Sequence, residues 1–178
     1  MEPHEIEPRF AMFPSHLAER SRTLELAGVP TLLAHPDWQK PAPVMFWMHG
    51  RTVTKELDPG RYLRWIRAGI AAVSVDLPGH GQRQGPKLHG PDTTPGVLEQ
   101  MLGEIDGVLE ALRESEHGRY FDLTRIGIGG MSAGGMVTLR RLCDEHQFRC
   151  AAVESTTGWL GELYDPEETR GRPWPAAH

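Results

Sequence analysis

The sequence has no long apolar run and no excess of positive charge. No stretch of about 18 or more consecutive apolar residues occurs among its 178 residues, which predicts no membrane-spanning helix. The 24 Asp and Glu outnumber the 19 Lys and Arg, and the formal net charge of −5 argues against nucleic acid or anionic membrane as a partner. The first ten residues, MEPHEIEPRF, are acidic and polar, unlike a signal peptide, so we expect a cytoplasmic enzyme or binding module.

Cysteine is also scarce. Cys143 and Cys150 are the only two in the chain. A disulfide or a redox pair would be the functional interpretation, but the spacing is not C-x-x-C, and two cysteines define neither a disulfide framework nor a zinc site. We therefore expect two small, buried thiols.

Hydrophobic residues make up 39% of the chain and charged residues 24%, as in an ordinary soluble protein with a real core. The length fits one domain, residues 1–178. The 20 glycines and 15 prolines cluster at turns between periodic segments, and no internal repeat is visible.

Short apolar segments alternate with amphipathic ones along the chain. Two strands around Gly28, residues 22–27 and 29–34, predict a hairpin. The further expected strands are 44–48, 70–76, 125–129 and 150–155; the expected helices begin at Asp58-Pro59, span 97–112, and run from Ser132 to about His146. This order predicts an α/β fold with a mostly parallel, doubly wound sheet and helices on both faces. Function is then expected at the carboxyl ends of the strands, in the loops after Met48, Val75, Gly129 and Ser155.

The clearest motif is GMSAG at 130–134, which matches G-x-S-x-G between a predicted strand and a predicted helix. A sharp strand-to-helix turn needs small flanking residues and holds the serine in a strained conformation. The turn also leaves Ser132 at a helix N-terminus, where free N–H groups favour a developing negative charge. The alternative is an ordinary serine in a glycine-rich turn, which the strand-turn-helix context disfavours.

A second motif, HGRT at 49–52, follows the first buried strand. An oxyanion hole needs a backbone N–H from the loop at that strand end, so the N–H groups of Arg51 and Ala133 are the candidates. His49 is either a base or, as we expect, a residue that holds the loop by hydrogen bonding. The Arg51 side chain either orients an anionic substrate group or is solvated.

The HGRT loop, the turn DLPGHG at 76–81 and the segment RIGIGGMSAGG at 125–135 together resemble the α/β-hydrolase superfamily. Within it they resemble bacterial carboxylesterases of the dienelactone-hydrolase and prolyl-oligopeptidase-like branch, over roughly residues 24–158. The resemblance implies serine-dependent hydrolysis of a small-molecule carboxyl ester or related acyl compound, with no metal or organic cofactor. It makes Ser132 the nucleophile, with the N–H groups of Arg51 and Ala133 as the oxyanion hole.

The remaining triad members are missing from their usual places. In this fold an Asp or Glu and then a His follow the serine, after the next two strands, whereas residues 159–178 contain no strand-like run. His146 would lie ~20 Å away along the helix from Ser132. Asp165 as the acid and His178 as the base stay open as alternatives.

His80 and His89 lie in loops on the same side of the predicted sheet, where we expect loop-stabilising or exposed roles. The helix at 97–112 and the loop at 82–95 are expected to border the acyl pocket.

We therefore predict an α/β-hydrolase domain that lacks its last strand-helix units. The strand at Cys150 would form a sheet edge, which favours a homodimer through that edge or marginal stability. One rival to a serine esterase is a non-catalytic remnant or interaction module of the same fold. Another is a thioesterase or peptidase, because a fold does not set its substrate.

Overall fold

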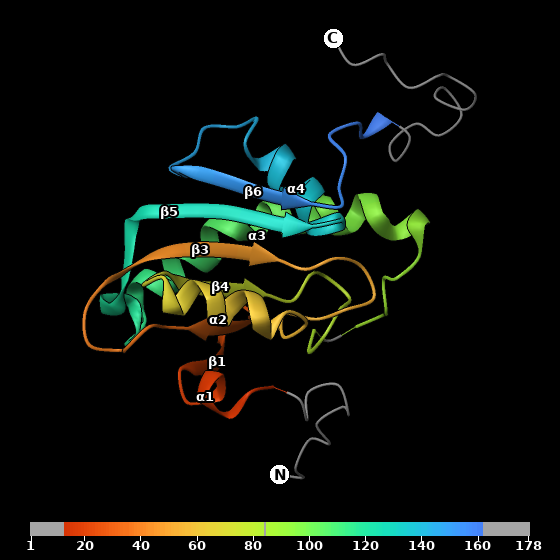
Figure 1. Cartoon of the computed structure of the whole chain (residues 1–178). Helices are drawn as coiled ribbons and strands as arrows, with labels where there is room; N and C mark the ends of the chain where they lie inside the picture. Colours follow the sequence, from red (N-terminus) through yellow and green to blue (C-terminus); the bar gives the residue numbers. More distant parts are fainter. Residues whose placement is uncertain (1–12, 84, 162–178) are drawn as a thin grey trace.

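The computed structural model describes residues 13–83 and 85–161 (Figure 1). The strands are β1 (Ser21–Leu26), β2 (Val29–Ala34), β3 (Ala42–Met48), β4 (Ala71–Val75), β5 (Phe121–Met131) and β6 (Cys150–Glu154). The helices are α1 (Ser15–Ala18), α2 (Pro59–Arg67), α3 (Thr94–Glu114) and α4 (Ala133–Arg141), with short 3₁₀ helices η2 (Pro91–Thr93) and η3 (Gly118–Tyr120).

The described strands form one sheet in the order β1-β2-β4-β3-β5-β6. β1 pairs with β2 and β2 with β4 in antiparallel fashion, whereas the β4–β3, β3–β5 and β5–β6 pairs are parallel. The mostly parallel α/β sheet expected from the sequence is thus confirmed. Because β4, β3, β5 and β6 run the same way, their carboxyl ends meet at one edge of the sheet.

The predicted hairpin and the predicted start of α2 form for local reasons. Ala27 and Gly28 have φ values of 50° and 78°, the left-handed pair that a tight two-residue hairpin turn requires. Asp58 caps α2 by accepting a hydrogen bond from the Arg61 backbone N–H at 3.0 Å, and Pro59 occupies the first helical position.

Helices cover both faces of the sheet, as expected (Figure 1). Alternate residues of β3 belong to two separate cores: Phe46 and Met48 pack with the apolar stripes of α3 and α4, whereas Trp47 packs with Leu17 of α1 and Tyr62 of α2. This period of two is the pattern of a strand buried on both faces.

Two expectations were wrong. The helix after Ser132 ends at Arg141 rather than near His146, because the Arg141 side chain donates to the Glu145 carbonyl at 2.8 Å and holds the chain in a non-helical turn. Cys143 and Cys150 are free, as expected, but exposed rather than buried. Cys143 follows the last turn of α4, and Cys150 opens the outer strand β6.

Smaller differences concern length: α3 and β5 extend beyond the expected ranges at both ends. None of the helices within residues 13–83 and 85–161 is both long and apolar enough to cross a bilayer.

Candidate active site

Ser132 occupies the turn between β5 and α4 with a strained backbone. Its φ of 51° and ψ of −115° lie in a region of backbone conformation that residues other than glycine rarely adopt. Such a conformation costs about 1–3 kcal/mol and persists only where the surroundings enforce it. The side chain is half-buried, and its Oγ makes no hydrogen bond to any residue that the structure describes.

Glycines on both sides make the turn possible. A Cβ at Gly130 would lie 2.8 Å from the Gly135 nitrogen, and one at Gly134 would lie 2.6 Å from the His49 carbonyl oxygen. A Cβ at Gly135 would lie 2.7 Å from that of Thr156. Real Cβ atoms do not approach other atoms this closely, so the motif's glycines are required by contact with neighbouring chain segments.

Three hydrogen bonds hold the Ser132 backbone in place. Its N–H donates to the Glu154 carbonyl at the end of β6, at 2.9 Å. Its own carbonyl accepts from the Met136 N–H at 2.9 Å and from the Thr156 hydroxyl at 2.8 Å. The turn is therefore tied to its own helix and to the loop after β6.

The loop after β3 reaches Ser132 from the other side. A Cβ at Gly50 would lie 3.2 Å from that of Ser132, and the Gly134 N–H donates to the His49 carbonyl at 3.1 Å. Among the described residues, no acceptor is found for the backbone N–H groups of Arg51 and Ala133. Neither candidate oxyanion donor is therefore used in a hydrogen bond within the described part of the chain.

Both ring nitrogens of His49 are hydrogen-bonded to loop backbone atoms. Its Nδ1–H donates to the Gly50 carbonyl at 2.6 Å, and its Nε2 accepts from the Leu77 N–H at 3.0 Å. Burial lowers its pKa from 6.5 to about 4, so the ring is neutral at pH 7. This geometry agrees with the loop-holding role expected for His49 and leaves no nitrogen free to act as a base.

A buried ion pair fixes the same two loops. Lys55 and Asp76 are both 0% exposed and lie 2.8 Å apart. The Lys55 ammonium also donates to Gln82 Oε1 at 2.9 Å, and the Lys55 N–H donates to Asp76 Oδ1 at 2.9 Å. A side chain at Gly81 would overlap with the Asp76 carboxylate. The turn at 76–81 is therefore built around this pair, which sequence reasoning missed because a lone loop lysine resembles a solvated one.

Arg61 links α2 to Glu154 at the carboxyl end of β6. Its guanidinium lies 4.1 Å from the centre of the Trp47 ring and donates two hydrogen bonds to the Glu154 carboxylate, at 2.8 and 2.7 Å. These bonds lower the pKa of Glu154. Glu154 also accepts the Ser132 N–H through its backbone, so Arg61 supports the serine turn from a distance.

Solved structures share this arrangement of elements. A Thermus thermophilus protein, TT1662, has a TM-score of 0.63 at 24% identity, with 78% of this chain and 58% of that one covered. An esterase from Pyrococcus furiosus has a TM-score of 0.64 at 18% sequence identity, and the match covers 84% of this chain and 55% of that one. A cold-adapted esterase from an Arctic intertidal metagenomic library has a TM-score of 0.57 at 23% identity, with 75% of this chain and 58% of that one covered. The chain has the α/β-hydrolase fold.

The present chain spans less than two thirds of the length of these structures. No profile of a known family matches its sequence, and neither does any curated protein. The fold agrees with the resemblance carried by the motifs at 49–52, 76–81 and 125–135.

Three further described histidines lie in loops: His80 and His89 after β4, and His146 before β6. His80 is buried and donates from Nδ1 to the Pro78 carbonyl at 2.8 Å, its Nε2 has no hydrogen-bond partner among the described residues, and its ring lies tilted against that of His89 with 4.5 Å between ring centres. His146 is exposed in the loop before β6, at the opposite end of that strand from Ser132. Asp165 and His178 lie outside the described residues.

The Arg51 side chain is half-buried and donates to the His89 carbonyl at 3.4 Å, so it bridges two loops instead of being fully solvated. Within residues 13–83 and 85–161, no group of three or more His, Cys, Asp or Glu side chains is placed to hold a metal ion.

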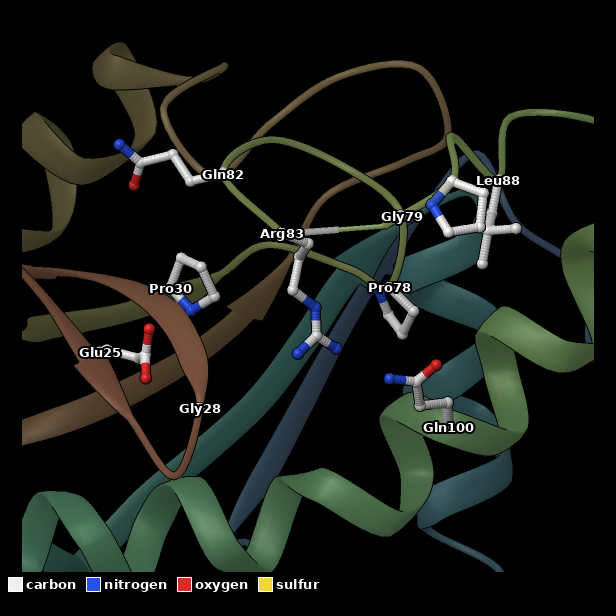
Figure 2. A pocket seen from close by; sticks show the side chains of 10 residues that line it. Glu25, Gly28, Pro30, Pro78, Gly79, Gln82, Arg83, Leu88 and Gln100 are labelled. Carbon is white, nitrogen blue, oxygen red and sulfur yellow. The ribbon is translucent and has the colours of Figure 1, made fainter. Parts of the chain in front are cut away.

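A pocket of about 520 Å³ lies beside the loop after β4 (Figure 2). Its walls come from the β1–β2 hairpin, from Gln100 of α3, and from six residues of the loop after β4: Pro78, Gly79, Gln82, Arg83, Pro86 and Leu88. Part of the expected acyl-pocket border, α3 and the 82–95 loop, does line this pocket. Ser132, Arg51 and Ala133 do not.

Proposed function

We propose that this chain carries the nucleophile of a serine hydrolase that cleaves carboxyl esters or related acyl compounds through an acyl-enzyme on Ser132. The observation that carries the proposal is the strained Ser132 turn, which the loop after β3 contacts at Gly50 and which the Ala133 N–H follows directly without an acceptor among the described residues. Strain of this kind is typical of catalytic positions. The esterases among the similar structures support the same reaction class.

The proposed reaction proceeds through an acyl-serine. Ser132 Oγ attacks the ester carbonyl carbon while a base takes its proton, and the carbonyl oxygen becomes an oxyanion. The N–H groups of Ala133 and Arg51, with the start of α4, would stabilise that charge. The C–O bond to the alcohol then breaks as the alcohol takes up the proton, leaving an acyl-serine. Water, deprotonated by the same base, releases the carboxylate and restores Ser132.

The base in this proposal comes from outside the described residues. Both ring nitrogens of His49 are hydrogen-bonded to the loops, His146 precedes β6 at the end of that strand opposite Ser132, and no described histidine is hydrogen-bonded to the Ser132 hydroxyl. We propose His178 or a histidine of a second chain for this role, with Asp165 as a candidate acid.

Covalent labelling by a fluorophosphonate tests the proposal. We expect the purified chain to be labelled, Ser132→Ala to lose the label, and Ser21→Ala to keep it, since Ser21 donates to the Leu17 carbonyl far from the turn. His178→Ala tests one source of the base: loss of labelling assigns the base to His178, and retention excludes it.

A non-catalytic module is the rival function. The observation that favours it is the Ser132 hydroxyl without a hydrogen-bonded imidazole among the described residues. A folded chain that resists the fluorophosphonate at every pH between 6 and 9 would support the module and sink the hydrolase proposal.

A further inference from the structure

Lys55 is a charged residue of the loop after β3 whose side chain lies in the interior. It and Asp76 are both fully buried, with 2.8 Å between the ammonium and the carboxylate. The ammonium also donates to Gln82 Oε1 at 2.9 Å, and the partly exposed Glu56 carboxylate lies 2.8 Å from it. One cation therefore connects side chains of the loop after β3 with side chains of the loop after β4.

The Asp76 carboxylate joins the backbones of the same two loops. One of its oxygens accepts from the Lys55 N–H at 2.9 Å, and the other accepts from the Gln82 N–H at 2.9 Å. The Lys55 carbonyl in turn accepts from the Tyr62 hydroxyl of α2. The chain around Lys55 is thus fixed by its side chain, its N–H and its carbonyl.

The other end of the loop after β3 contacts the Ser132 turn. A Cβ at Gly50 would lie 3.2 Å from that of Ser132, so the two segments are in contact there. Arg51 lies in the chain between this contact and Lys55. The position of its backbone N–H therefore depends on both points of attachment.

A buried ion pair of this kind is not explained by stability alone. Removing two charges from water costs free energy that their attraction offsets only in part, so an apolar pair in the same place often gives an equally stable protein. Unlike an apolar contact, the pair is directional, because its hydrogen bonds require partners at defined positions.

We propose that Lys55 is a positioning residue for the acyl transfer, an inference that rests on the function proposed above. Its ammonium, through Asp76, holds the loop at 49–55 against the Ser132 turn. The Arg51 N–H is thereby kept in place to stabilise the oxyanion.

The kinetics of fluorophosphonate labelling test this role with Lys55→Met. The dependence of the rate on reagent concentration separates reagent binding from the covalent step. We expect the limiting rate constant to fall about tenfold or more, because a displaced oxyanion donor acts only on the covalent step. The half-saturating concentration should stay within about twofold of the wild-type value, since Lys55 does not reach the reagent. A limiting rate constant equal to that of the wild type would overturn the proposal.

Arg141→Met is the matched control for a loss of stability. Arg141 is a buried cation, 9% exposed, which pairs with Asp106 at 2.9 Å. It lies at the end of α4 opposite Ser132, and its partners belong to neither loop. We expect this variant to be less stable but labelled at the wild-type rate. Equal slowing by Arg141→Met and Lys55→Met would make Lys55 a merely structural residue and would overturn the proposal.

Hydrogen exchange of the same proteins tests the loop without the reaction. The amides of residues 49–57 should exchange about tenfold faster in Lys55→Met than in the wild type, and at the wild-type rate in Arg141→Met. Wild-type exchange of this segment in Lys55→Met would also overturn the proposal. If the wild type resists the fluorophosphonate, the proposed hydrolase reaction fails, whereas the exchange comparison still decides whether Lys55 holds the loop.

A double variant covers the case in which Lys55→Met does not fold. Lys55→Met combined with Asp76→Asn removes both charges, so that no buried charge is left without a partner. The ammonium bridge is still lost, and we expect the same slower labelling and the same faster exchange of residues 49–57. Wild-type values of both quantities in the folded double variant would exclude the positioning role.

Discussion

Gly134 is a position at which the chain has no room for a side chain. Its position beside the His49 carbonyl brings α4 and β3 into contact, and that contact places Ser132 next to the loop at 49–52. Both glycines of GMSAG were expected to be small for this reason, so sequence reasoning reached the turn. It could not foresee the contact partners, since they come from β3 and the loop after β6.

Gly134→Ala should therefore lower the free energy of unfolding by about 1–3 kcal/mol, because the methyl group has no room. Gly103→Ala is the matched control: this glycine lies on the exposed side of α3 with no atom within 4 Å of its would-be Cβ. We expect this substitution to raise the free energy of unfolding by about 0.5–1 kcal/mol, because alanine has a higher helix propensity than glycine. Urea unfolding measures both, and effects of the same sign would contradict the packing described for the turn.

His49 makes stability depend on pH. Its pKa is about 4 in the folded chain and 6.5 without burial, so the unfolded state binds the extra proton as pH falls from about 6.5 to 4. Stability is retained above that window and is lost through it, by about 2 kcal/mol at pH 5.

Urea unfolding at pH 7 and pH 5 should show this loss in the wild type. His49→Gln, which cannot be protonated, should lose less over the same interval. A remainder is expected, since burial also lowers the pKa of His35 and His80. Identical pH dependence in both proteins would mean that His49 is not the group responsible.

Among the helices and strands, features set by neighbours along the chain could be predicted from the sequence, whereas features set by tertiary contacts could not. The hairpin, the Asp58 cap and the apolar stripe of α3 were visible in the sequence because each depends on neighbours along the chain. The end of α4 was not, since it involves Arg141, whose side chain pairs with Asp106 of α3 at 2.9 Å, a residue distant in sequence. The exposure of Cys150 likewise depends on the position of β6 at the sheet edge.

The Arg61–Glu154 pair should couple α2 to β6 measurably. A double-mutant cycle with Arg61→Gln and Glu154→Gln should give a coupling free energy of about 1 kcal/mol, because the pair is bidentate and the arginine is stacked on Trp47. The exposed Arg113–Glu110 pair on α3 is the control, with about 0.3–0.5 kcal/mol expected. Equal coupling in the two cycles would contradict the anchoring role.

At the scale of the whole molecule, β6 is the outermost of the described strands on its side of the sheet, and no described strand pairs with its outer side. All five residues of this strand are exposed, Val153 by 38%, and none of them is Lys or Pro, which commonly protect edges. We expect this chain to self-associate through β6. Sedimentation velocity should show a concentration-dependent dimer that Val153→Lys suppresses, whereas a monomer at every concentration would contradict the expectation.

The order of the strands also sets the sequence of events during synthesis. β3 acquires β4 as a neighbour early, but Ala42 pairs with Phe121, so its other side stays open until β5 has left the ribosome. Ser132 follows β5 directly and is then held by Glu154 of β6. The two sides of the serine site thus join in one late step. A nascent chain stalled before that point would present the apolar strand β3 to other chains, and aggregation on the ribosome is the consequence.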